Sequence, residues 1–180
     1  EVGFTLGSVM DEAYLKTSVY GVRSSLFVNE WMGFEVQMLK TSIADSEDRK
    51  ALNSMTFKPI PKEGDAIDPN KTVSPDPEVN AIYGMTDFNG VAAPFYGKLN
   101  FMDRFIVYTD LYVTAGMSKV DTDQGDKTAI NFGAGERFYI GKSASFRVDF
   151  KGRSYEEVRA EQNIRKTAYT MDLGASYFFN

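Results

Sequence analysis

Residues 172–180 read Asp-Leu-Gly-Ala-Ser-Tyr-Phe-Phe-Asn, and this stretch decides the fold. Successive side chains of an extended strand point to opposite faces. One face would carry Tyr169, Met171, Leu173, Ala175, Tyr177 and Phe179, and the other Thr170, Asp172, Gly174 and Ser176. An apolar outer face with a polar or small inner face suits a β-barrel surrounded by lipid. An amphipathic strand of a soluble sheet alternates in the same way, so the rest of the chain must decide.

Four positions of this stretch also match a targeting pattern. Asp172, Gly174, Tyr177 and Phe179 resemble the C-terminal signal by which outer-membrane β-barrel proteins are recognised and inserted. The resemblance implies that barrel-assembly machinery binds the chain during insertion. One departure is Asn180, because the signal usually ends on the aromatic residue itself.

Composition limits the kinds of partner. The 180 residues suffice for one domain, and 25 acidic against 20 basic residues give a net charge of −5. No basic face is available, so a nucleic-acid partner is not expected. No run of about 18 apolar residues predicts a transmembrane helix. No secretory signal precedes Glu1, and we expect a signal peptide to have been removed on export.

The sequence contains neither histidine nor cysteine. This excludes metal sites built on imidazole and catalytic Ser-His or Cys-His pairs. The acidic stretch Asp121–Lys127 lacks the ligand spacing of a calcium loop. We therefore predict a protein that is not an enzyme and has no metal or other cofactor.

Alternating segments recur along the chain and predict eight strands. The predicted strands are Val2–Gly7, about 14–28, a third from Phe34, Ala93–Phe101, Phe105 to about Ser118, Thr128–Ile140, Ala144 to about Tyr155, and a last one after Arg165. Short turns alternate with longer connections, which is the outer-membrane arrangement. Eight strands is also the number at which side chains just fill a closed barrel.

One long segment interrupts the pattern. Residues 44–91 are polar and contain five of the six prolines. A stretch of this length and composition is typical of a surface loop, and we expect it outside the cell. Ser46 followed by two acidic residues predicts a short helix at its start.

The two faces of the strands differ in charge. One face carries Arg23, Glu35, Lys98, Asp110, Arg137, Arg147, Asp149, Lys151 and Asp172. The opposite face carries Phe95, Leu99, Phe101, Val107, Leu111, Val113, Ile130, Phe132, Ala134, Phe146, Val148 and Phe150. Such an apolar surface would make a water-soluble protein associate. The charged face therefore predicts a paired network inside the barrel, although a solvated face stays open.

Several stretches resemble a known family. They are Phe27-Val-Asn-Glu-Trp-Met-Gly-Phe-Glu-Val36, Tyr96-Gly-Lys-Leu-Asn-Phe101, Ile106-Val-Tyr-Thr-Asp-Leu-Tyr112 and Asn131-Phe-Gly-Ala-Gly-Glu-Arg-Phe138. They resemble an outer-membrane β-barrel domain family common in myxobacteria and their predatory relatives. The resemblance covers nearly all of the chain except the proline-rich segment. It implies an eight-stranded barrel like the membrane domain of OmpA, and no particular activity.

Glu136 departs from this pattern, because it shares the apolar, lipid-facing side. Three explanations stay open. The carboxylate can reach the membrane interface, since Glu136 is close to the turn at Gly141. A bulge at Gly133 or Gly135 can rotate it inward. Alternatively, Glu136 contacts a partner protein in the membrane.

Together these observations predict an all-β, eight-stranded, antiparallel, up-and-down transmembrane barrel with a polar, filled interior. We expect it in the outer membrane of a Gram-negative bacterium, in contact with membrane lipid and lipopolysaccharide. The predicted role is structural, or the binding of an envelope protein. A narrow pore and a soluble, lipocalin-like ligand-binding barrel are the alternatives. The sequence identifies neither a specific partner nor an oligomeric state.

Overall fold

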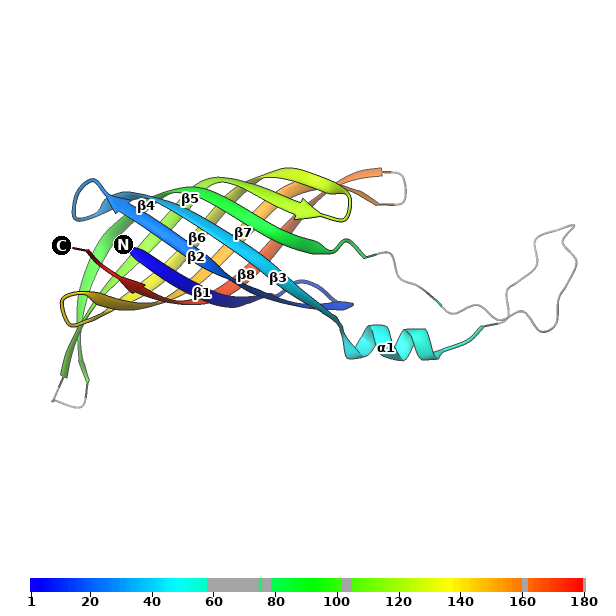
Figure 1. Cartoon of the computed structure of the whole chain (residues 1–180), viewed down its shortest axis with the longest axis horizontal. Helices are drawn as coiled ribbons and strands as arrows, with labels where there is room; N and C mark the ends of the chain where they lie inside the picture. Colours follow the sequence, from blue (N-terminus) through cyan, green and yellow to red (C-terminus); the bar gives the residue numbers. More distant parts are fainter. Residues whose placement is uncertain (58–74, 76–78, 102–104, 160–161, 180) are drawn as a thin grey trace, which may run out of the picture.

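The computed structural model describes residues 1–57, 75, 79–101, 105–159 and 162–179. These residues form a closed barrel of eight strands and one short helix (Figure 1). The elements are β1 (Val2–Val9), β2 (Leu15–Phe27), β3 (Met32–Asp45), α1 (Glu47–Ser54), β4 (Ile82–Phe101), β5 (Phe105–Thr122), β6 (Gly125–Ile140), β7 (Ala144–Arg159) and β8 (Gln162–Tyr177). The predicted all-β class is therefore confirmed.

Each strand pairs with the next in antiparallel order, and β1 pairs with β8 to close the ring. The closing register runs from Val2 opposite Tyr177 to Val9 opposite Thr170. The predicted strand number and antiparallel order are confirmed. Figure 1 places both chain ends at one end of the barrel and α1 beyond the other. We call these the terminal end and the helix end.

The strands are longer than the sequence predicts. β4 begins at Ile82, so residues 82–91 belong to the barrel and not to the predicted loop. The predicted acidic loop after Asp121 is a tight turn, because β5 ends at Thr122 and β6 begins at Gly125. Gly125 adopts a φ of 93°, a conformation that glycine tolerates best. Most of the proline-rich segment lies outside the described residues.

Helix α1 begins where the sequence predicts a short helix. The hydroxyl of Ser46 accepts a hydrogen bond from the backbone N–H of Arg49 at 3.2 Å, and two acidic residues occupy the first turn. The Ser46 hydroxyl also donates to the carbonyl of Ala13 at 3.0 Å, which ties the helix start to the barrel. No helix in the described part of the chain is long and apolar enough to cross a membrane.

The alternation of side chains places apolar groups outside the barrel and charged groups inside it. Residues on the outer face include Phe4, Leu6, Val22, Leu26, Phe34, Met38, Phe88, Val113, Ile130, Phe132, Phe150, Met171 and Leu173, all exposed. The largest fully buried side chains include four arginines, and Arg147 and Arg153 have no exposed surface. This distribution is the reverse of that in a water-soluble barrel.

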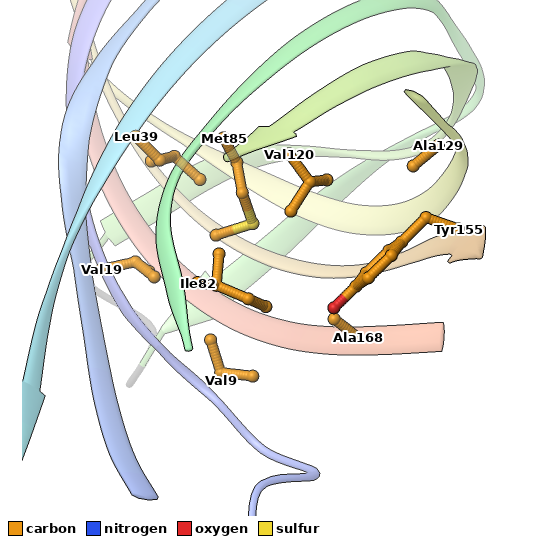
Figure 2. Close-up of a cluster of buried hydrophobic side chains, with 9 residues drawn as sticks. All are labelled: Val9, Val19, Leu39, Ile82, Met85, Val120, Ala129, Tyr155 and Ala168. Carbon is orange, nitrogen blue, oxygen red and sulfur yellow. The ribbon is translucent and has the colours of Figure 1, made fainter. Parts of the chain in front are cut away.

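The interior has two regions, one mainly charged and one mainly apolar. Nine buried residues form an apolar cluster near the helix end, shown in Figure 2: Val9, Val19, Leu39, Ile82, Met85, Val120, Ala129, Tyr155 and Ala168. Most of the buried charged side chains occupy the middle of the barrel and the terminal end, whereas Glu157 is buried near the helix end and accepts a hydrogen bond from Asn80 at 2.9 Å. The predicted polar interior is thus correct for part of the barrel only, because inward positions near the helix end carry aliphatic residues.

Candidate functional site

The buried charges are centred on β7. Arg147, Asp149, Lys151 and Arg153 are two residues apart, so all four point to the same, inner face. Each side chain is at most 1% exposed. Every one of them reaches a residue on another strand, so the network crosses the interior and does not follow one wall.

Arg147 joins three strands at the centre of this network. Its guanidinium Nη2 is 3.0 Å from Glu35 Oε2 on β3 and 3.2 Å from Asp149 Oδ1. Its Nε donates to the Tyr112 hydroxyl on β5 at 2.8 Å, and that hydroxyl donates to Asp149. Arg23 on β2 completes the group, with Nη1 at 2.8 Å from Asp149 Oδ2. Two guanidinium groups therefore share one carboxylate.

Lys151 extends the network toward β3 and β4. Its ammonium is 2.9 Å from Glu35 Oε1 and donates to Gln37 Oε1 at 2.6 Å. Asp87 Oδ2 is farther away, at 3.8 Å. Lys151 therefore lies between two carboxylates on different strands.

Arg153 and Asp87 form the best-aligned pair. Arg153 donates from Nε to Asp87 Oδ1 at 2.9 Å and from Nη2 to Asp87 Oδ2 at 2.6 Å. This bidentate geometry is the strongest arrangement of an arginine and a carboxylate. Ser118 also donates to Asp87, at 2.7 Å, and Arg153 Nη1 donates to Thr170 at 2.9 Å. The pair thus connects β4, β5, β7 and β8.

Several members of this network are absent from the set predicted by sequence. Arg153 continues the alternation of Arg147, Asp149 and Lys151, so the period of two residues was a usable signal. Asp87 was missed because residues 82–91 were expected to belong to the loop. No charge pattern marks Tyr112, whose burial depends on the inward position of β5 that it occupies.

Lys98 is the one member of the predicted charge network that is not inside. It is exposed, and its ammonium lies 5.2 Å from the centre of the Tyr108 ring. Its backbone position keeps the predicted inward parity, because Lys98 lies opposite Tyr108 after the register shift in β4 between Ala92 and Phe95. It is exposed because it lies beyond the end of the pairing with β3, which stops at Ala92. Beyond the shift β4 pairs with β5 alone, and Figure 1 shows these strand ends bending away from the barrel.

Arg137 and Asp110 lie near the terminal end. Arg137 Nη1 is 3.3 Å from the Glu1 carboxylate, and its Nε is 3.8 Å from Asp110 Oδ1. Four aromatic rings surround the guanidinium, those of Phe27, Tyr112, Tyr139 and Phe178, with centroids 4.8 to 5.9 Å away. Planar guanidinium groups stack on such rings, which explains how this charge is held in a narrow space.

The residues of the predicted insertion signal lie on both faces of β8. Asp172 is fully buried, and Gly174 leaves room for the side chain of Arg147, whose Cγ would be 3.1 Å from a Cβ added at this glycine. Tyr177 ends β8 on the outer face, and its ring meets that of Phe179 edge to face at 5.3 Å. Asn180 lies outside the described residues.

Glu136 faces outward and is half-buried. Its register with β5 and β7 is continuous from Ile130 onward, so the bulge considered for Gly133 or Gly135 is absent. Its carboxylate accepts a hydrogen bond from the hydroxyl of Thr109 at 2.8 Å. A neighbour on the same outer face therefore satisfies part of its hydrogen-bonding capacity.

The inner network joins the strands to one another across the interior of the barrel. Among the described residues, no group of three or more metal-ligating side chains is placed to hold a metal ion. The buried cations and carboxylates pair with each other across the interior. What this arrangement does is fill the middle of the barrel with fixed charges.

Comparisons with known proteins found remote likenesses. No protein-family model matches the chain, and no curated protein matches it. It is similar to the N-terminal β-barrel domain of Pseudomonas aeruginosa OprF, with a TM-score of 0.45 and 12% identity, over 99% of this chain and 96% of that one. It is also similar to the outer membrane protein AlkL in DMPC lipid bilayers, with a TM-score of 0.32 and 13% identity, over 98% of this chain and 85% of that one. At this distance neither assigns a family, and the resemblance to the myxobacterial family stays a prediction.

Proposed function

We propose that this protein is an integral outer-membrane β-barrel with a structural or protein-binding role in the envelope, and that it is neither an enzyme nor a pore. The observation that carries the proposal is the reversed sidedness of the barrel. A continuous ring of exposed Phe, Leu, Val, Ile and Met covers the outside, while arginine and lysine side chains are buried. Only a lipid environment makes this distribution favourable over the whole circumference.

The same observation argues against a soluble, ligand-binding barrel. Such a barrel keeps apolar residues inside, around its ligand, and charged residues outside. Here Phe34, Phe88 and Ile130 are each more than half exposed, at 65%, 57% and 61%.

Fractionation and heat modifiability test the membrane assignment. We expect the chain, expressed with an export signal, to sediment with outer membranes and to resist extraction by urea. On a detergent gel the unheated, folded barrel should migrate differently from the boiled chain. Recovery from the periplasm without detergent, with no effect of boiling, would refute the assignment.

The contacts across the interior argue against a pore. Arg23 on β2 meets Asp149 on β7, and Lys151 on β7 meets Glu35 on β3, so side chains from separate walls join in the middle. The apolar cluster of Figure 2 fills the interior nearer the helix end. We expect no reproducible conductance steps when the folded protein is added to planar bilayers. Regular steps that disappear after Lys151→Met would support a pore instead.

The insertion signal is proposed to act through its aromatic residues. Tyr177 and Phe179 are exposed at the end of β8 and hold each other in an edge-to-face contact. Phe179→Ser should reduce assembly in cells, measured as the folded fraction on unheated gels. Tyr83→Ser is the control, because Tyr83 is also an exposed aromatic residue but lies at the helix end. If both variants assemble to the same extent, Phe179 is not part of the insertion signal.

Glu136 is proposed as a contact for a membrane partner. A carboxylate in an apolar surface is costly, and among the described residues the one hydrogen bond from Thr109 leaves acceptor capacity unused. A photo-crosslinker placed at position 136 should yield a protein adduct in native membranes. Adducts with lipid alone would count against the contact.

A further inference from the structure

A pocket of about 780 Å³ opens at the terminal end of the barrel. Its walls include Glu30, Trp31, Pro94, Tyr96, Asp110 and Tyr139. This volume lies in the range of small-molecule sites. None of the roles proposed above uses this pocket.

The backbone of β4 and of the β2–β3 turn holds the walls of the pocket in fixed positions. The register shift between Ala92 and Phe95 turns β4 outward at Pro94, and the N–H of Ala93 donates to the carbonyl of Trp31 at 2.7 Å. The side chain of Asn29 accepts hydrogen bonds from the N–H groups of Trp31 and Met32, at 3.1 and 2.7 Å. These bonds fix the turn that carries Trp31.

The chemistry of the walls favours a cation. Trp31 and Tyr96 supply two aromatic rings, whose faces attract positive charge, while the ring of Tyr139 already lies beside the Arg137 guanidinium. Glu30 and Asp110 supply two carboxylates. The same two carboxylates would repel an anion.

Asp110 narrows the choice among cations. Its side chain is 9% exposed, and Oδ2 accepts the hydroxyl of Tyr139 at 2.5 Å. Oδ1 is buried, accepts no hydrogen bond from any described residue, and is 3.8 Å from Arg137 Nε. A buried acceptor without a donor is costly, and a primary ammonium supplies N–H donors whereas a quaternary ammonium has none. The pocket therefore fits a primary ammonium.

The surroundings indicate what carries that ammonium. An apolar groove of about 870 Å³ runs over the outer face, and its walls include Met32, Phe34, Ala92, Val113, Phe132 and Phe150. The groove and the pocket are built on the same two stretches of chain, residues 28–34 and 90–96. An apolar chain beside an ammonium group is the chemistry of a membrane lipid.

We propose that the pocket binds the ethanolamine head group of a phospholipid whose acyl chain lies in the adjoining groove. The ammonium donates to the Asp110 carboxylate after a small rotation of that side chain, and it lies against the rings of Trp31 and Tyr96, with Glu30 adding charge complementarity. This inference rests on the proposed membrane function.

Lipid binding to the full chain, folded in detergent micelles, tests the inference. Native mass spectrometry would compare phosphatidylethanolamine, phosphatidylcholine and phosphatidylglycerol with identical acyl chains. We expect phosphatidylethanolamine to bind about fivefold more tightly than either of the others, the effect of one partly exposed cation–π or charged contact. Equal binding of the three lipids, or preference for phosphatidylglycerol, would overturn the proposal. If phosphatidylcholine binds most tightly, Asp110 does not accept a hydrogen bond from the ligand.

Variants locate the site. Tyr96→Leu and Asp110→Asn should each abolish the preference, whereas Tyr83→Leu, at a similarly exposed tyrosine of the helix end, should leave it unchanged. If Tyr83→Leu also loses the preference for phosphatidylethanolamine, the lipid does not bind in the pocket at the terminal end. If Asp110→Asn does not fold, the lipid comparison and Tyr96→Leu still decide. A chain that fails to fold in any lipid refutes the proposed function, whereas a folded barrel without lipid preference refutes this inference alone.

Discussion

Replacing Arg153 by methionine should destabilise the barrel by about 4 kcal/mol. Removing one partner of a buried charge pair costs about 3–5 kcal/mol, because the other charge is left without compensation. Asp87 would lose two hydrogen bonds of 2.6 and 2.9 Å to Arg153. Asp87 would keep its hydrogen bond from the Ser118 hydroxyl at 2.7 Å and the more distant Lys151 ammonium at 3.8 Å. Because these contacts remain, we expect the loss of stability to lie within the range of about 3–5 kcal/mol and not above it.

Urea unfolding of the full chain in detergent micelles measures this cost. The fluorescence of Trp31 reports the transition, since it is the one tryptophan of the sequence. Arg165→Met is the matched control, because Arg165 is exposed and its loss should change stability by no more than about 0.5 kcal/mol. The reasoning fails if Arg153→Met costs less than about 1 kcal/mol.

A second replacement separates the ion pair from the packing. Arg153→Met combined with Asp87→Leu removes both charges and leaves apolar groups in their place. We expect the double variant to recover at least about 2 kcal/mol relative to Arg153→Met, because no buried charge is left alone. Additive losses would show that the two charges do not interact, contrary to their bidentate geometry.

Three further predictions concern other parts of the chain. Gly116→Ala should cost about 1–3 kcal/mol in the same unfolding assay, because the added Cβ would overlap the carbonyl oxygen of Phe88. Ser46→Ala should weaken α1 by about 1 kcal/mol through loss of its cap, measured as faster amide exchange in residues 47–54. Burial raises the pKa of Glu12, so its protonated form favours the folded connection between β1 and β2. Protection of residues 10–14 from amide exchange should therefore be greatest at a pH below the pKa that Glu12 has in the unfolded chain. It should decrease as the pH rises through the higher pKa that Glu12 has in the folded chain, and Glu12→Gln should remove this pH dependence.

The sequence was sufficient for the architecture because the alternation persists along almost every strand. From Arg147 to Lys151, charged and apolar residues alternate without interruption, so strand, register and sidedness could all be inferred from the chain. Glu35 and Asp149 could be placed inside for the same reason. Their pairing with Arg147 could not be predicted, since it depends on which strands face each other across the barrel.

Two failures have local causes. The inward series Met85, Asp87, Asn89 and Val91 alternates clearly, but the prolines before it made the whole stretch resemble a loop. Lys98 has the inward parity that the alternation predicts, but it lies on the part of β4 that pairs with β5 alone. Alternation alone does not show that this part of β4 extends past the end of β3, which leaves the lysine exposed.

The pairing of β1 with β8 has a consequence for how the chain can be rearranged. Because Val2 lies opposite Tyr177, the first and last strands are neighbours, and a short linker would join them as an ordinary hairpin. New ends could then be placed between β3 and β4 without breaking any of the strand pairs that the structure describes. Such a circular permutant should close into the same ring, so the barrel is specified by which strands are neighbours and not by where the polypeptide starts.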